Sequence, residues 1–424
     1  MEYKPDVVIK PANTEQVARV LELAYREGIP VHPRGAATGL SGGSVPQGGG
    51  IALVLTAMNS IYEVNRQDML AVVGPGVITA DLHRAVEAEG LFYPPDPGSS
   101  EFCTMGGNVA ESAGGPRGLK YGVTRDYVLG LEVVLADGRV MRCGGRTVKN
   151  VTGYDLCRLF TGSEGTLGVI TEITVRLLAL PKAVKTMLAS FNNLEQSAEA
   201  ISAIMAAGVV PRTLEIMDDL AIAVVEKYGS FGLPLEAAAV LLIETDGDEE
   251  QAAREAAVVR SLLEEAGASE IKIAADADEA DNLWRARRAV SAAIARIKPT
   301  KISEDATVPR SKIPAMIRRL RQIGRKYNLD LVIFGHAGDG NLHPNIVCDR
   351  RDPEEMARVE KAIGEIFTAA LELGGTLSGE HGIGLLKAPY LASELGEVGL
   401  AAIVDIKKAL DPKNILNPGK IFPS

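Results

Sequence analysis

The residue types best suited to chemistry are concentrated in two short glycine-rich segments in the last quarter of the chain. The sequence contains five histidines, and three of them, His336, His343 and His381, lie in these segments. The first segment runs over residues 334–345, and the second, over residues 378–384, also contains a glutamate. Imidazole and carboxylate groups bind divalent metals and transfer protons near neutral pH. We therefore expect the catalytic site in these two segments.

The spacing of these residues suits a divalent-metal site. A buried strand expected over residues 331–334 delivers His336 at its tip, and a six-residue turn, Ala337–Leu342, returns the chain so that His343 can face the same point. Glu380 would arrive from the second segment. Two imidazoles and one carboxylate leave coordination positions open for a substrate. The alternative, that these histidines merely cap strand ends, suits a single histidine better than this constellation.

Composition limits the classes of function. The 424 residues are 46% hydrophobic and 24% charged, which is typical of a soluble globular protein with two or three domains. A net charge of −10 argues against nucleic acid as the main partner. No apolar run approaches about 18 residues, so no membrane span is expected, and no signal-peptide core follows the first residues.

The four cysteines lack any CxxC spacing. This pattern gives no sign of an iron–sulfur cluster or a zinc ribbon, and it suits a reducing cytoplasm. We therefore expect a cytoplasmic protein that holds no metal cluster for onward electron transfer.

The elements before Pro181 predict one α+β domain. Asn13 caps a helix that Gly28 ends, and a buried strand follows over residues 51–55. Asp137-Gly138 predicts a two-residue hairpin between two further strands. Residues 169–177 alternate in hydropathy, as expected of a strand.

Beyond Pro181 the order of elements changes to strand, helix, strand, strand, helix, strand. We expect these elements at residues 186–191, 194–207, 213–217, 239–244, 249–266 and 271–274. That order is the split-βαβ, ferredoxin-like pattern. A helix over residues 281–297, a strand ending at His336 and a helix from Pro353 extend it.

Three loops rich in glycine and hydroxyl side chains lie in the first domain. They span residues 34–43, 104–116 and 161–168. Bare backbone amides in such loops can converge on phosphate oxygens. The first loop alone could be a mobile surface loop, but three of them favour a long ligand with a diphosphate, and a dinucleotide fits better than a mononucleotide.

The chain resembles a known family in several motifs. PRGAATGLSGG, TMGGNVAESAGG and TGSEGTLGVITEI are similar to the FAD-binding domain of the vanillyl-alcohol oxidase class of flavoproteins. HAGDGNLH, SGEHGIG and NPGKIF resemble its D-2-hydroxyacid dehydrogenase branch, which includes D-lactate dehydrogenases and FAD-bearing glycolate oxidase subunits. The resemblance implies an α+β fold with a PCMH-type FAD-binding domain (1–180), a ferredoxin-like α/β cap domain (181–395) and a C-terminal segment that returns to the FAD domain (396–424). One departure is the start of the chain, because family members usually carry several tens of residues before the equivalent of Pro11.

The resemblance also implies which residues bind FAD. Members with covalent flavin often place a histidine at the position of Thr38, so we expect noncovalent FAD here. The expected FAD-binding residues are Arg34, Gly35, Ala36, Ala37, Thr38, Gly39, Ser41, Pro97, Gly98, Thr104, Gly107, Asn108, Ser112, Gly114, Gly162, Glu164, Gly165, Ile170 and Asn417.

Carried over to the second domain, the resemblance makes His336, His343 and Glu380 the ligands of a divalent metal, with Zn²⁺ expected, and His381 the base. It makes Arg287, on a helix, the residue that grips the substrate carboxylate.

Two further positions bear on the substrate. The resemblance makes Asn345 a further substrate contact, and Ser291 could add a hydroxyl one turn after the arginine. The family's 2-hydroxyglutarate members carry a lysine where this chain has Ser303, which disfavours a dicarboxylate substrate.

The expected activity is FAD-dependent oxidation of a D-2-hydroxy acid of the glycolate or D-lactate type to the 2-oxo acid. The expected partners are the small substrate and an electron-acceptor protein, such as an iron–sulfur subunit or an electron-transfer flavoprotein, with a homodimer as one option for assembly. The alternatives are a noncatalytic FAD subunit of a larger oxidase complex and an oxidase of amino-sugars or phenols on the same fold.

Overall fold

The computed structural model describes residues 3–422, which divide into two compact units. The described part of the first unit comprises residues 3–115, 122–180 and 380–422, and the second unit comprises residues 116–121 and 181–379. The expected domain boundaries lie after residues 180 and 395. The chain leaves the first unit after Leu180 but returns to it at Glu380, sixteen residues earlier than expected.

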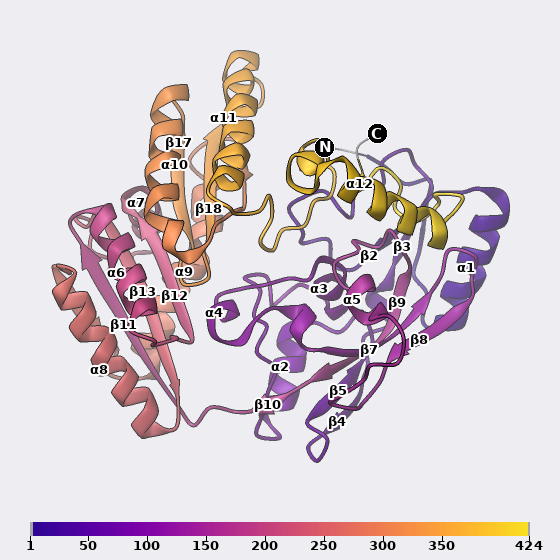
Figure 1. Ribbon diagram of the computed structural model, residues 1–424, viewed down its shortest axis with the longest axis horizontal. Helices are drawn as coiled ribbons and strands as arrows, with labels where there is room; N and C mark the ends of the chain where they lie inside the picture. The colour runs from indigo at the N-terminus through magenta and orange to yellow at the C-terminus, as the bar shows by residue number, and fades with distance from the viewer. Residues whose placement is uncertain (1–2, 423–424) are drawn as a thin grey trace. The chain divides into compact units, whose positions relative to one another are not determined.

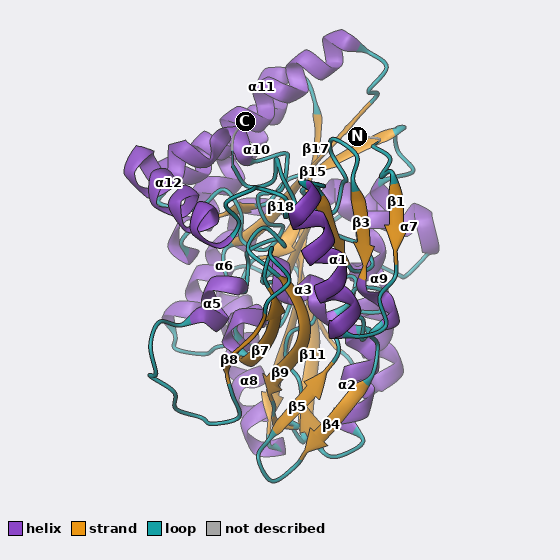
Figure 2. Ribbon diagram, turned by 90° about the vertical axis from the view of Figure 1, so that its right-hand side faces the viewer, coloured by secondary structure: helices purple, strands orange, loops and turns teal. Residues whose placement is uncertain are grey.

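The first unit contains a five-stranded antiparallel sheet and a three-stranded parallel sheet. The five strands follow the order β4-β5-β9-β7-β8, and Figure 2 shows several of them side by side. The three parallel strands follow the order β1-β3-β2, and β6 pairs with β10. The strands are β1 (Val7–Ile9), β2 (Val31–Arg34), β3 (Ile51–Val54), β4 (Ile61–Asn65), β5 (Leu70–Val73), β6 (Leu91–Phe92), β7 (Val128–Val134), β8 (Val140–Gly144), β9 (Val169–Arg176) and β10 (Leu178–Ala179).

The first helix of this unit begins and ends at the predicted residues. Asn13 accepts a hydrogen bond from the Gln16 amide at the start of α1, and Gly28 ends that helix with a φ of 69°, as predicted. The helices are α1 (Thr14–Glu27), α2 (Thr79–Glu87), α3 (Met105–Glu111), α5 (Leu156–Phe160) and α12 (Leu391–Leu410).

The predicted hairpin at Asp137-Gly138 is present, with a longer connection than expected. Strands β7 and β8 pair up to Val134 and Val140, so five residues join them rather than two. Gly138 takes a φ of 87°, which few other residues adopt without strain.

The second unit is built on one eight-stranded sheet (Figure 1). Its strands follow the order β14-β11-β13-β12-β17-β18-β15, with β16 also paired to β18. The first four form the predicted ferredoxin-like arrangement, and the structure adds the helix α7 between β12 and β13. The strands are β11 (Ala183–Phe191), β12 (Thr213–Asp218), β13 (Ala239–Gly247), β14 (Glu270–Ile273), β15 (Thr300–Ser303), β16 (Ala306–Thr307), β17 (Asp330–His336) and β18 (Asn341–Cys348).

Helices cover both faces of this sheet. One apolar cluster joins side chains of α6, α8, α10 and α11 to one face, and a second cluster joins side chains of α7 and α9 to the other. The short α4 also belongs to this unit, because Leu119 packs into the first of these clusters. The helices are α4 (Gly118–Tyr121), α6 (Leu194–Ala206), α7 (Asp219–Gly229), α8 (Glu249–Glu265), α9 (Ala277–Ile294), α10 (Ile313–Tyr327) and α11 (Pro353–Glu372).

Two further observations concern the helices and the cysteines. Within residues 3–422, none of the helices combines the length and the apolar character needed to cross a membrane. All four cysteines are free thiols.

Candidate functional site

The hairpin of β17 and β18 brings two of the predicted metal ligands together. His343 stands opposite Phe334 in the antiparallel register, and His336 is two residues beyond Phe334, so both imidazoles lie on the same face of the sheet. Their ring centroids are 5.0 Å apart and their planes are nearly perpendicular. The turn between the strands is shorter than predicted, because Asn341 already pairs with His336.

A buried glutamate holds one of these imidazoles. Glu215 lies on β12, where pairing of its neighbour Ile216 with Gly335 sets Glu215 beside His336. The Nδ1 atom of His336 lies 2.7 Å from Glu215 Oε1. Burial alone would raise the pKa of Glu215, yet the pKa is below its usual value because His336 and Arg287 stabilise the ionised form.

Arg287, the predicted substrate arginine, is bound to the same carboxylate. It projects from α9, and its Nε atom donates to Glu215 Oε2 at 2.8 Å while Nη2 lies 2.5 Å from the same oxygen. The guanidinium also lies 4.8 Å from the ring centroid of Phe334. One edge of the guanidinium is therefore used by Glu215, and a two-point grip on a substrate must use the edge formed by Nη1 and Nη2.

One helical turn beyond Arg287, the hydroxyl of Ser291 accepts a hydrogen bond from Lys301 Nζ at 2.5 Å. Lys301 lies on β15 two residues before Ser303, and therefore on the same side of that strand. The expectation against a dicarboxylate substrate rests on Ser303, which stands where the 2-hydroxyglutarate members carry a lysine. The structure brings the lysine of position 301 to this helix instead, so that argument against a dicarboxylate substrate is weakened.

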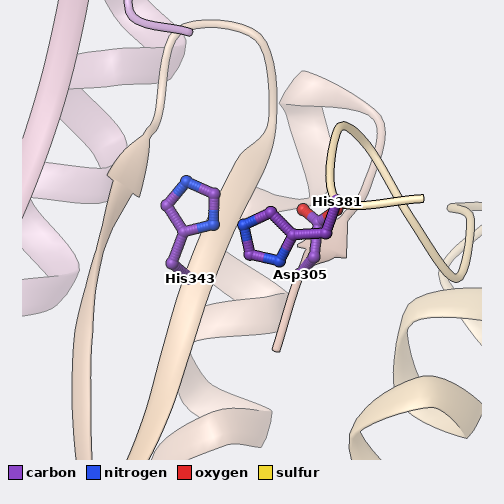
Figure 3. A group of neighbouring side chains, drawn as sticks. All are labelled: Asp305, His343 and His381. Carbon is purple, nitrogen blue, oxygen red and sulfur yellow. The ribbon is translucent and has the colours of Figure 1, made fainter. Parts of the chain in front are cut away.

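Two more polar groups complete this face. Asn345 is fully buried and donates to the His343 carbonyl at 2.8 Å, and its Oδ1 atom has no hydrogen-bond partner in the described part of the chain. Asp305 is also fully buried, accepts a hydrogen bond from the Ser378 hydroxyl, and offers an oxygen within 4.8 Å of a nitrogen of His343 (Figure 3). The buried Asn345 Oδ1 atom can therefore accept a hydrogen bond from a bound ligand.

Sequence reasoning missed Glu215, Asp305 and Lys301. For Glu215 a signal existed, because a carboxylate within the apolar strand Thr213–Asp218 must find a buried partner. No local pattern identifies the other two, because their relevance comes from strand pairing.

The three glycine-rich loops of the first unit lie against one another, as expected for one long ligand. A Cβ atom at Gly35 in the first loop would lie 2.2 Å from Thr104 Oγ1 in the second. The Gly162 amide of the third loop donates to the Val109 carbonyl at 2.9 Å. A tight approach of bare backbone from three segments is what a dinucleotide cradle requires.

The return segment, which we define as residues 380–384, contains Glu380 and His381 and packs on the same loops. A Cβ atom at Gly114 would lie 2.6 Å from Glu380 Oε2, so this carboxylate lies against the second loop. The Ile383 and Gly384 amides donate to the two oxygens of Glu164, each at 2.7 Å.

The Glu164 carboxylate is buried at this anchor. Burial raises its pKa, although the amides of Ile383 and Gly384 favour the ionised form. Glu164 therefore positions the return segment, a role that the predicted FAD contact did not include.

Other predicted FAD-binding residues have structural roles of their own. The Asn417 amide donates to the carbonyls of Gly43 and Glu164, at 2.9 and 2.7 Å, and so ties the first and third loops together. Asn108 donates to the Thr79 hydroxyl inside the unit. Ile170 is buried in β9. Two of the remaining predicted residues lie in regular elements: Arg34 ends β2, and Gly107 lies in α3, a helix that occupies most of the predicted second loop. The others lie outside helices and strands, in the loops or next to them: Ala36, Ala37, Thr38, Gly39, Ser41, Pro97, Gly98, Ser112 and Gly165.

Two buried polar atoms of this unit fit an anionic ligand. Lys420 is fully buried, and its Nζ atom has no hydrogen-bond partner among residues 3–422. The buried hydroxyl of Ser41, in the first loop, also lacks one there. Burial lowers the pKa of Lys420 to about 8, and a nearby negative charge such as a diphosphate would stabilise its ammonium form.

Comparison with known proteins gives matches over almost the whole chain. The family model described as "FAD binding domain" matches residues 5–144, and "FAD linked oxidases, C-terminal domain" matches residues 180–421. The "Glycolate oxidase subunit GlcD" of Bacillus subtilis is 50% identical over 99% of this chain and 89% of its own length. The "D-lactate dehydrogenase" of Archaeoglobus fulgidus is 38% identical over 98% of this chain and 91% of its own length.

Solved structures share the fold. p-Cresol methylhydroxylase matches with a TM-score of 0.82 at 20% identity, covering 98% of this chain and 88% of that one. A 4-ethylphenol oxidase from Gulosibacter chungangensis matches with a TM-score of 0.79 at 22% identity, covering 98% and 89% of the two chains. The predicted α+β class with a PCMH-type FAD-binding fold is confirmed.

Proposed function

The chain belongs to the family of FAD-linked oxidases, and from this premise we propose that it oxidises a D-2-hydroxy acid of the glycolate or D-lactate type to the 2-oxo acid. The names of its relatives, a glycolate oxidase subunit and a D-lactate dehydrogenase, support this substrate class. The observation that carries the proposal is the sheet face on which the ring centroids of His336 and His343 lie 5.0 Å apart, next to Arg287 and Asn345. An electron carrier alone would not need this set.

The residues of the first unit fit FAD. Its diphosphate would be held by the loop amides of residues 34–43, by the Ser41 hydroxyl and by the Lys420 ammonium, whose buried atoms otherwise lack partners. When bound, the flavin supplies a hydride acceptor for the α-carbon of the substrate. The chain itself would position the cofactor, because the three glycine-rich loops limit where a dinucleotide can lie.

The residues of the return segment and of the β17–β18 hairpin fit a divalent metal, with Zn²⁺ expected. His336, His343 and Glu380 would hold it, and Glu380 directly follows Gly379, the last residue of the second unit. A bound divalent ion acts as a Lewis acid that lowers the pKa of a coordinated hydroxyl. Two nitrogens and one carboxylate oxygen are a common donor set for such an ion.

Three residues of the chain then have separate roles in binding the substrate and moving its proton. Arg287 binds the substrate carboxylate through Nη1 and Nη2, since Glu215 occupies the other edge. The Asn345 Oδ1 atom accepts a hydrogen bond from the substrate. His381 takes the proton of the hydroxyl, because an imidazole is matched to proton transfer near neutral pH.

Electrons leave through a separate acceptor protein. The four cysteines form no cluster motif, and two of its relatives are named as subunits of a glycolate oxidase, which supports an assembly with partner subunits. An iron–sulfur subunit or an electron-transfer flavoprotein would serve as the acceptor.

Anaerobic mixing of the purified yellow protein with glycolate, D-lactate, L-lactate and D-2-hydroxyglutarate tests the proposal. We expect the flavin absorbance to bleach with glycolate or D-lactate, and not with L-lactate. Treatment with a chelator should remove about one divalent ion per flavin and abolish bleaching while FAD stays bound. Bleaching by L-lactate but not D-lactate would overturn the stereochemistry, and full activity without metal would overturn the metal site.

A further inference from the structure

The carboxylate of Glu215 connects two parts of the proposed substrate site that are far apart in the sequence. Its Oε1 atom accepts from His336, 121 residues later in the chain, and its Oε2 atom accepts from Arg287, 72 residues later. The three side chains come from a strand, a hairpin and a helix of the same unit. A single carboxylate therefore fixes one predicted metal ligand and the predicted substrate arginine together.

Burial makes this bridge a rigid one. Glu215 is 1% exposed, His336 6% and Arg287 8%, so water does not compete for their hydrogen bonds. Each carboxylate oxygen has its own partner, and removing the carboxylate would leave a buried guanidinium without a counter-charge. Strand pairing between β12 and β17 holds the backbone of Glu215 and His336 in register, so the contact does not depend on a flexible loop.

The bridge also decides which nitrogen of His336 can bind a metal. A carboxylate at 2.7 Å from Nδ1 requires the proton on that nitrogen, which leaves the lone pair on Nε2. In metal-binding histidines, the N–H of the ring nitrogen that does not bind the metal commonly donates a hydrogen bond to a carboxylate. This bond orients the ring and raises its basicity.

We propose that Glu215 is a positioning residue that couples metal binding at His336 to carboxylate binding at Arg287. The inference rests on the proposed metal site and deepens it. It predicts that loss of the Glu215 charge weakens both functions at once, because Glu215 binds one predicted residue of each function.

The test compares Zn²⁺ binding by the FAD-loaded wild-type protein and its Glu215→Gln variant, by competition with a chromogenic chelator. We expect the Zn²⁺ dissociation constant of the variant to rise about 10–100-fold. The KM for the hydroxy acid should rise as well, because Arg287 loses the partner that aims it. Wild-type protein that binds no Zn²⁺ would refute the proposed metal site, whereas equal Zn²⁺ binding by both proteins would refute the role of Glu215.

Glu244→Gln is a matched control in the same sheet. Glu244 is also buried, on β13, and accepts hydrogen bonds from Trp284 Nε1 at 2.6 Å and from the Thr186 hydroxyl at 3.0 Å. No hydrogen bond or ion pair of the described chain links it to His336 or Arg287. We expect this variant to lose stability with an unchanged Zn²⁺ dissociation constant. A weakening equal to that of Glu215→Gln would assign the effect to general loosening of the sheet.

A double variant covers the case in which Glu215→Gln fails to fold. Glu215→Gln with Arg287→Gln removes both buried charges together, which avoids the unpaired guanidinium. Arg287→Gln alone keeps the Glu215–His336 contact and should keep near-wild-type Zn²⁺ binding with a raised KM. The double variant should bind Zn²⁺ at least about 10-fold more weakly than Arg287→Gln. Equal binding by these two variants would overturn the proposal.

Discussion

Glu164 and Gly384 are 220 residues apart in the chain, yet Glu164 Oε2 accepts a hydrogen bond from the Gly384 amide at 2.7 Å. The other oxygen of this carboxylate accepts from the Ile383 amide. The segment that carries the predicted base His381 is therefore anchored to the third glycine-rich loop, within the same unit. The third loop thus anchors the segment that carries the predicted base, and it is also a candidate part of the cofactor cradle.

Replacing Glu164 with Gln should loosen this segment. A glutamine side chain offers one acceptor oxygen to two amide donors, so one buried amide loses its partner, at a cost of about 1–3 kcal/mol in unfolding free energy. We expect flavin bleaching by the hydroxy acid to slow by more than about 10-fold, because a misplaced catalytic group costs rate steeply. Stopped-flow absorbance and urea unfolding measure the two effects. Glu172→Gln, whose carboxylate pairs with Arg142 near the surface, should change each by much less.

Replacing His381 with Asn should remove the base while leaving both binding sites. We expect FAD content and Zn²⁺ content to stay near one per chain and the rate of flavin bleaching to fall by about 10²–10⁴-fold. Anaerobic stopped-flow with D-lactate and glycolate gives the rate, and metal analysis of the same sample gives the content. Bleaching at the wild-type rate would show that another group takes the proton.

The lowered pKa of Lys420 predicts that the stability of the FAD-free protein depends on pH. Burial lowers its folded pKa to about 8, and its unfolded pKa is about 10.4. Between these values the unfolded chain binds more protons than the folded one, so the unfolding free energy should rise as the pH rises from about 8 to 10. Urea unfolding at the two pH values should show this rise in wild type and lose it in Lys420→Met.

The control for this prediction is Lys408→Met, which removes an exposed lysine of α12. This variant should keep the wild-type pH trend. The Lys420→Met protein should also retain FAD less well than wild type during gel filtration, since it lacks a buried cation for the diphosphate. A pH trend that persists in Lys420→Met would assign it to other groups.

Gly35→Ala and Gly145→Ala form a matched pair of variants that tests the close packing of the glycine-rich loops. A Cβ atom at position 35 would lie 2.2 Å from Thr104 Oγ1, whereas at position 145 it would meet no atom within 4 Å. Gly35→Ala should therefore cost about 1–3 kcal/mol by overpacking and reduce FAD retention. Gly145→Ala should leave both unchanged. Equal FAD content in the two purified variants would contradict the close approach of the first and second loops.

Much of the fold follows from local sequence. The cap at Asn13 and the glycine at position 28 bound α1 as predicted, because capping depends on residues only a few positions apart. The order of strands and helices after Pro181 likewise predicted the ferredoxin-like part of the second unit. The helix α7 and the short turn between β17 and β18 were not predicted, because their residues are apolar or glycine-rich and compatible with several conformations.

For the candidate site, the chemical groups could be identified from the sequence: histidines, a glutamate, an arginine and three glycine-rich loops in recognisable motifs. The side chains that orient these groups became apparent only from the packing of distant segments. Glu215 bridges His336 and Arg287, and Glu164 anchors the segment after His381, through partners at least 72 residues away. Such contacts arise from strand register and helix packing between distant segments, and a buried carboxylate has no local pattern that names its partner.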